Sequence, residues 1–178
     1  MKKQKGVYDL NVRIMRLPKQ DEPDDSLTQR EKLLREKAEK GDRDAMYDLS
    51  FHKLLSSDCQ EIKEGEHWLR KAAELGHVKA MYSLGWRKVE GVKLDQNFEE
   101  GETWLRIAVE KQSDYAMYRL GIYKLDGKYL EQDIEEGERL LRRSAELGYS
   151  KAMYELGMRK VKGRYCKTGY KGRRKMAQ

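Results

Sequence analysis

Apolar residues follow a helical period along most of the chain, and the pattern itself repeats. The element Ala-Met-Tyr-x-Leu begins at Ala45, Ala80, Ala116 and Ala152, in steps of 35, 36 and 36 residues. Within each copy the apolar residues lie three or four positions apart, which is typical of one face of an α-helix. The pattern predicts four equivalent helices, designated A, over about 44–55, 79–90, 115–126 and 151–162.

A second element lies between these copies and has the same period. It contains Glu-Gly-Glu followed closely by Trp-Leu-Arg or Leu-Leu-Arg, and its glycines are Gly65, Gly101 and Gly137. We predict helices of a second type, designated B, over about 61–75, 97–111 and 133–147. Asn97 and Asp133 precede two of them with glutamate three residues later, a typical N-terminal capping signature. A leading helix of the B type is expected over about 27–40.

This alternation predicts an all-α repeat fold of about eight helices, because a sustained period near 36 residues marks stacked helix pairs. The repeat domain is expected over 26–162. It comprises the leading helix, repeats near 44–78, 79–114 and 115–150, and a final helix at 151–162. We expect residues 1–25 to form an extended or partly disordered leader, and 163–178 to form a flexible basic tail.

Glycine occupies fixed columns inside both helix types. A glycine within a helix costs about 1 kcal/mol relative to alanine, so its regular use predicts close contacts between neighbouring helix backbones. The repeat near 79–114, which holds the third B helix when the leading helix is counted, departs from the pattern, since Lys111-Gln112-Ser113 stands where the other repeats have a Leu-Gly turn. We therefore expect its B helix to end differently.

The combined motif resembles the Sel-one-like repeat family, whose members are tetratricopeptide-like. It consists of Ala-Met-Tyr-x-Leu-Gly, a glycine six residues on, and an Asp- or Asn-capped helix with Trp-Leu-Arg-x-Ala-x-Glu-x-Gly, and it covers about residues 30–163. The resemblance implies a right-handed α-solenoid of antiparallel helix pairs, with the A helices on its concave face. It also implies a role as a protein-interaction scaffold or adaptor.

One column of the A helices carries lysine where the family usually has an aromatic residue: Lys53, Lys88, Lys124 and Lys160. We hypothesise that this lysine column binds an acidic peptide or protein surface on the concave face, together with Arg87, Tyr123 and Arg159. The alternative is that the lysine stems cover neighbouring helices while their charges face water.

The net charge of +7 equals the charge of the C-terminal segment, because residues 162–178 contain seven basic residues and no acidic residue. The body of the chain is close to neutral. The tail could bind nucleic-acid phosphates or another anionic surface without sequence specificity. The candidate residues for such a contact are Arg164, Lys167, Lys171, Arg173, Arg174 and Lys175.

The sequence contains no recognisable catalytic, cofactor or metal motif. The three histidines occupy different columns, and the two cysteines, Cys59 and Cys166, form neither a metal motif nor a disulfide framework. We therefore predict a protein without enzymatic activity, bound metal or cofactor. No secretory signal and no long apolar segment is present, so a cytoplasmic location without membrane spans is expected.

The leading functional prediction is a scaffold or adaptor that binds a peptide or protein, possibly an acidic one, on the concave face. One alternative is a nucleic-acid-associated protein that acts through its basic tail. Another is an immunity or antitoxin-like inhibitor of a protein effector, because a solenoid can wrap a partner. The sequence indicates neither the partner nor the oligomeric state.

Overall fold

The computed structural model describes residues 25–169, with side chains from 29 to 160. This part of the chain contains eight α-helices and no strand: α1 (Asp25–Glu39), α2 (Arg43–Leu55), α3 (Cys59–Glu74), α4 (Val78–Glu90), α5 (Phe98–Glu110), α6 (Asp114–Asp126), α7 (Ile134–Glu146) and α8 (Ser150–Gly169). The predicted all-α repeat fold is confirmed. The expected leader at 1–25 lies outside the described residues except for Asp25, and 170–178 lie outside them too.

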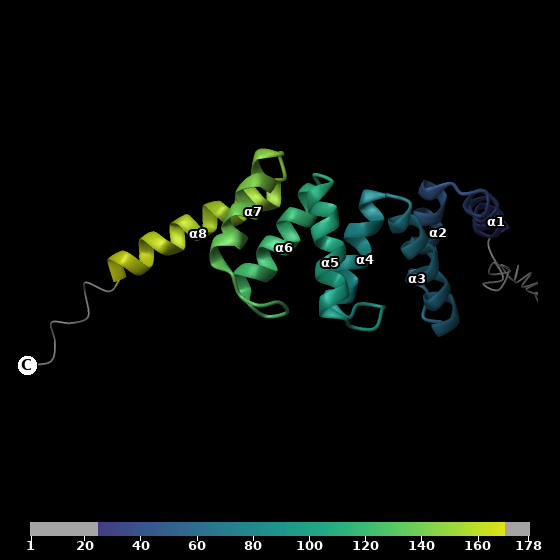
Figure 1. Cartoon of the computed structure of the whole chain (residues 1–178), viewed down its shortest axis with the longest axis horizontal. Helices are drawn as coiled ribbons and strands as arrows, with labels where there is room; N and C mark the ends of the chain where they lie inside the picture. The colour runs from purple at the N-terminus through teal and green to yellow at the C-terminus, as the bar shows by residue number, and fades with distance from the viewer. Residues whose placement is uncertain (1–24, 170–178) are drawn as a thin grey trace, which may run out of the picture.

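The helices stand in a row, and each packs against the next one along the chain (Figure 1). The A helices are α2, α4, α6 and α8, and the B helices are α1, α3, α5 and α7. Within the described residues, α4 and α6 approach each other more closely than α3 and α5 or α5 and α7 do. The side of the array on which the A helices lie is called the A-helix face below.

Local sequence signals determine where the helices begin. The Asn97 side chain accepts a hydrogen bond from the amide of Glu100 at 3.0 Å, and the Asp133 side chain accepts one from Glu136 at 2.9 Å. These contacts confirm the two predicted N-caps, which satisfy amides that have no partner within the helix. His77 caps α4 in the same way, since its Nδ1 accepts from the amide of Ala80 at 3.0 Å.

The expectation that the third B helix ends differently is wrong. Gln112 adopts a left-handed conformation with φ of 62°, as Gly76 and Gly148 do at the equivalent turns with φ of 85° and 94°. The Gln112 amide donates to the carbonyl of Val109, matching the Gly76 amide and Ala73. Tertiary packing thus imposes the glycine conformation on glutamine, at a cost of about 1–2 kcal/mol.

Leucines from two columns form the centre of the core. They are exposed by no more than 1% and alternate between A and B helices: Leu49, Leu69, Leu84, Leu105, Leu120 and Leu141. The columns of glycine lie beside them and bring the helix backbones together. A Cβ atom placed on Gly101 would lie 2.8 Å from the carbonyl oxygen of Gly85, and one on Gly137 would lie 2.9 Å from that of Gly121. The predicted close contacts are confirmed.

The last A helix differs from its predecessors in length. Helices α4 and α6 end at left-handed glycines, Gly91 and Gly127, from which the chain turns back toward the following B helix. Helix α8 instead continues through the equivalent Gly163 to Gly169, beyond its expected end at 162. It extends outward past α7, with no described helix on its outer side (Figure 1).

Candidate protein-interaction surface

Three of the four residues of the lysine column lie inside the protein rather than on an open face. Lys53, Lys88 and Lys124 are each exposed by only 6–7%, although the sequence hypotheses place their charges at the surface. Each ammonium group sits between carboxylates of the two B helices that flank its own helix. For example, Lys124 Nζ lies 3.0 Å from Glu102 of α5 and 4.0 Å from Glu136 of α7. These lysines join consecutive repeats.

Arginines complete the same ion-pair clusters. Arg106 contacts Glu102 at 2.7 Å within its own helix and Glu136 at 2.8 Å on the next B helix. We use the term ion-pair quartet for one lysine, one arginine and the two glutamates between them. Three complete quartets are described: Glu31, Arg35, Lys53 and Glu64; Glu66, Arg70, Lys88 and Glu100; and Glu102, Arg106, Lys124 and Glu136.

The quartets shift the ionisation of their members toward the charged forms. Burial raises the pKa of the Glu102 carboxyl, but hydrogen bonds from Lys124 and Arg106 outweigh this effect and lower the pKa overall. Burial likewise opposes the charge of Lys53, yet hydrogen bonds to Glu31 and Glu61 leave its pKa raised. The lysine and arginine charges of a quartet therefore stabilise the ionised form of its glutamates, and the glutamates stabilise the charged lysine and arginine.

Tyr123 and Arg159, also predicted to contact a partner, make internal contacts. Tyr123 is exposed by 3%, and its hydroxyl donates to Glu90 at 2.6 Å. Burial, followed by this hydrogen bond, raises its pKa. Arg159 contacts Asp126 at 3.3 Å, and Lys160 is exposed. The prediction that these residues and the lysine column bind a partner stays a prediction, but most of them offer little surface for it.

Arg87 is the predicted contact residue with the most unusual surroundings. It is exposed by 9%, and no described carboxylate forms an ion pair with it. Its Nε is buried without a hydrogen-bond partner, and its Nη1 makes only a long 3.5 Å contact to the carbonyl of Val92. Burial lowers the pKa of its guanidinium, opposed by the nearby Tyr47 and Tyr82. A buried charge without a counter-ion is energetically costly.

Aromatic side chains surround Arg87 on the A-helix face. Its guanidinium lies 4.7 Å from the centre of the Trp86 ring, and that of Arg119 lies 5.3 Å from the same ring. Unlike Arg87, Arg119 has a counter-ion, since it contacts Glu90 at 2.8 Å. This arginine–aromatic cluster consists of Tyr82, Trp86, Arg87 and Arg119. Sequence reasoning singled out Arg87 but missed Trp86 and Arg119.

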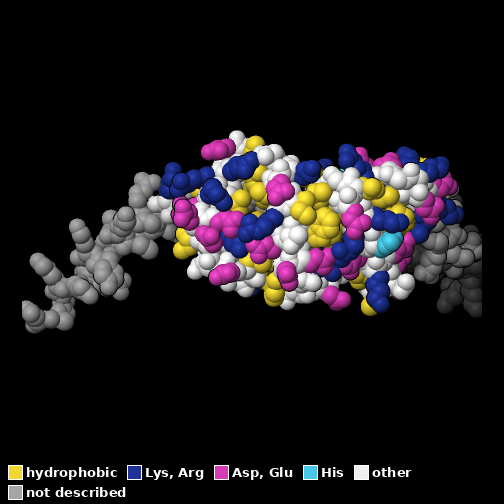
Figure 2. All heavy atoms as spheres, in the orientation of Figure 1, with side chains coloured by type: hydrophobic (Ala, Val, Ile, Leu, Met, Phe, Trp, Pro, Cys, Tyr) yellow, Lys and Arg dark blue, Asp and Glu magenta, His cyan; other side chains and the backbone are white. Residues whose placement is uncertain are grey.

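Apolar side chains extend this surface along the array. The column that contains Trp86 is Phe51, Trp86, Ile122 and Met158. Phe51 is exposed by 47% and Met158 by 36%, while Trp86 and Ile122 are half-buried. On the face visible in Figure 2, hydrophobic side chains are interspersed with acidic and basic ones, and no large patch of one charge sign is seen there. This mixture suits recognition of a protein segment.

Two other kinds of feature are absent from the described residues. In the part of the chain with described side chains, no group of three or more His, Cys, Asp or Glu residues could hold a metal ion. No helix among the described residues is long and apolar enough to span a membrane. Two of the predicted anion-binding residues, Arg164 and Lys167, belong to α8, but their side chains are not among those described. The others lie beyond residue 169.

Comparison with known proteins identifies the class. The model of the Sel1 repeat matches residues 43–77, 78–113, 114–149 and 150–169, and the chain belongs to this family. Proteins built from these repeats generally mediate protein–protein interactions and are generally non-catalytic. No curated protein matches the chain.

Two solved structures share the fold. One is a protective antigen of uropathogenic Escherichia coli strains that displays an SLR fold, with 26% identity, a TM-score of 0.68, and coverage of 75% of this chain. The other is a Sel1 repeat protein from Oxalobacter formigenes, with 27% identity, a TM-score of 0.62, and coverage of 71%. The matched regions span only 29% and 36% of those proteins.

Proposed function

We propose that this protein is a scaffold or adaptor that holds a peptide or protein segment on its A-helix face, with Arg87 as the receptor for a carboxylate of the partner. The observation that supports this most strongly is the buried guanidinium of Arg87, which has no acidic partner among the described residues. A carboxylate from a bound segment would supply the missing charge and hydrogen bonds. The neighbouring apolar column would supply contact area.

The lysine column has a different role in this proposal. Its buried members already contact two or more carboxylates each. A partner carboxylate would have to compete with those pairs, whereas at Arg87 it would displace none. We therefore expect an acidic group of the partner to bind at Arg87 rather than along the lysine column.

The two phenylalanines of the chain allow a matched test of the binding face. Phe51 lies on α2 of the A-helix face and is 47% exposed, while Phe98 starts B helix α5 and is 44% exposed. Each is replaced by the photoreactive analogue benzoylphenylalanine in the full chain, which is then irradiated in a lysate of its own source. We expect a discrete cross-linked partner from position 51 and none from position 98. Equal yields, or a partner from position 98 alone, would exclude the A-helix face.

Replacing Arg87 with methionine should stabilise the free protein. Methionine keeps much of the packing but removes a buried charge that has no counter-ion, so the free energy of unfolding should rise by about 1 kcal/mol. Urea denaturation followed by circular dichroism measures this change. Arg106→Met is the matched control and should lower stability, because Arg106 contacts two carboxylates. A loss of stability in Arg87→Met would mean that the guanidinium already has an internal structural role.

A further inference from the structure

Among the described helices, none follows the last A helix, α8, in the way that a B helix follows each of the other A helices. Helices α2, α4 and α6 each make their most extensive contacts with the B helix that follows them, and no described helix follows α8. Gly157 of α8 occupies the column of Gly85 and Gly121, which lie against the backbone of the next B helix. A Cβ atom on Gly157 would meet nothing within 4 Å.

The apolar side chains around this position are correspondingly uncovered. Met153 is exposed by 50%, whereas the equivalent Met81 and Met117 are exposed by 4% and 0%. Tyr154 is exposed by 67%, whereas the equivalent Tyr82 and Tyr118 are half-buried. The end of the array therefore presents a surface that elsewhere in this chain is buried by a helix. This surface, formed by Glu138, Arg142, Met153 and Gly157, is called the end face below.

Charge on the end face shows what kind of helix would fit. Glu138 and Arg142 occupy the columns of Glu102 and Arg106, and Lys160 occupies the lysine column. In the complete quartet Arg106 contacts two glutamates, the second being Glu136 on the following B helix. Arg142 contacts Glu138 alone, at 2.8 Å, and is 66% exposed. Among the described residues, Arg142 thus lacks the second carboxylate that a following helix provides for Arg106.

We propose that the end face binds an amphipathic helix of a partner protein that carries Glu-Gly followed by leucine four residues after the glycine. This is the pattern of the B helices in this chain, as in Glu100, Gly101 and Leu105. The glutamate would complete the ion pairs at Arg142, the glycine would allow close approach to Gly157, and the leucine would cover the exposed Met153. The inference is independent of the function proposed for the A-helix face.

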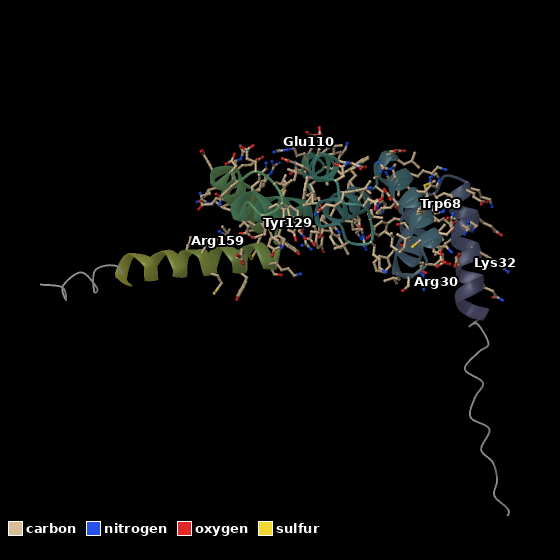
Figure 3. The ribbon with its side chains drawn as sticks, turned by 90° about the horizontal axis from the view of Figure 1, so that it is seen from below. Arg30, Lys32, Trp68, Glu110, Tyr129 and Arg159 are labelled. Atoms are coloured by element: carbon tan, nitrogen blue, oxygen red, sulfur yellow. The ribbon has the colours of Figure 1, made fainter. Side chains whose placement is uncertain are left out.

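Two other occupants fit the end face less well. A second copy stacked end to end would present α1, where Gln29 and Arg30 stand in the columns of glutamate and glycine. Arg30 and Lys32 lie on α1 at the opposite end of the array from Arg159 of α8 (Figure 3). The bulk of Arg30 opposes close approach to Gly157. The positive charges of Arg30 and Lys32 oppose close approach to Arg142. The basic segment 162–178 contains no acidic residue, so it has no glutamate side chain to place beside Arg142.

A peptide from the chain itself provides a probe for this interaction. Residues 97–111 comprise α5 with its cap, and a fluorescently labelled peptide of this sequence serves as the helix. We expect its anisotropy to rise saturably when the full-length protein is added. Gly157→Leu and Arg142→Glu should each weaken binding by about tenfold or more, because one blocks close approach and the other opposes the peptide glutamate. Arg139→Glu changes an exposed residue on α7, the helix that carries Arg142, and should leave binding unaltered.

Charge reversal in the peptide makes the test specific. The Glu100→Lys peptide should bind the original protein weakly and regain affinity for Arg142→Glu. Thermal denaturation checks that each protein variant is folded, which is expected because Gly157 lies in open space. Absence of binding, or binding that neither Gly157→Leu nor Arg142→Glu alters, would overturn the proposal. Self-association of the protein that Gly157→Leu abolishes would also overturn it, because the occupant would then be a second copy.

Discussion

Replacing Gly101 with alanine is expected to destabilise the protein by about 2–3 kcal/mol, a typical cost of overpacking at a site that cannot relax. The added methyl group would lie 2.6 Å from Val89 Cγ2 and 2.8 Å from both the amide nitrogen of Val89 and the carbonyl oxygen of Gly85. Two of these obstacles are backbone atoms, so α4 and α5 would have to separate. The intrinsic preference of alanine for helices offsets only about 1 kcal/mol. Urea denaturation measures the loss.

Gly157→Ala is the control, because it makes the same chemical change at a glycine of the facing helical column, that of Gly85 and Gly121. Nothing lies within 4 Å of its Cβ position, so only the helix preference of alanine acts, and stability should rise by about 0.5–1 kcal/mol. A substantial loss of stability in Gly157→Ala would show that another part of the chain already packs against this face. Unchanged stability in Gly101→Ala would show that α4 and α5 are less closely packed than described.

Replacing Lys124 with methionine should lower the free energy of unfolding by about 2–3 kcal/mol, since one partner of a largely buried ion-pair cluster is removed. Glu102 and Glu136 would keep only Arg106 as a positive partner. Methionine retains the aliphatic stem, so the loss reports mainly on the charge. The measurement is chemical denaturation of the full chain at neutral pH.

Lys160→Met provides the comparison within the same column. Lys160 is exposed, and exposed substitutions usually change stability by no more than about 0.5 kcal/mol. If Lys124→Met and Lys160→Met had the same small effect, the lysine column would not join the repeats. The hypothesis that the lysine column binds an acidic partner would then be favoured.

Periodicity made the architecture predictable from the sequence. Repeated columns of leucine and glycine specify which faces meet, and Asn97 and Asp133 mark where helices begin. The end of the third B helix was not predictable from local chemistry. Gln112 is held in a left-handed conformation by the packing of the helices around it, and a propensity argument contains no information on that packing. The continuation of α8 through Gly163 was missed for a similar reason, because a glycine permits a turn without requiring one.

The lysine column shows how a correct pattern can give an incomplete interpretation. Its regular spacing was visible, but exposure was inferred from the type of residue alone. The two glutamates that flank each B-helix glycine had the same period as the lysines. Since the glycine marks the closest approach of two helices, carboxylates beside it lie near the neighbouring A helix. The shared period of lysines and glutamates, together with the glycine contact, could have predicted the quartets. That Arg87 has no counter-ion among the described residues could be learned only from the three-dimensional structure.

The most direct test of the proposed function is the dissociation constant of the partner captured through position 51, measured by isothermal titration calorimetry with Arg87→Met. Loss of a buried charge-assisted contact should weaken binding by about tenfold or more, although the variant is expected to be the more stable protein. Arg139→Met, on the exposed B side, should bind like the original chain. An unchanged dissociation constant for Arg87→Met would contradict the account, because the buried guanidinium would then have no part in holding the partner.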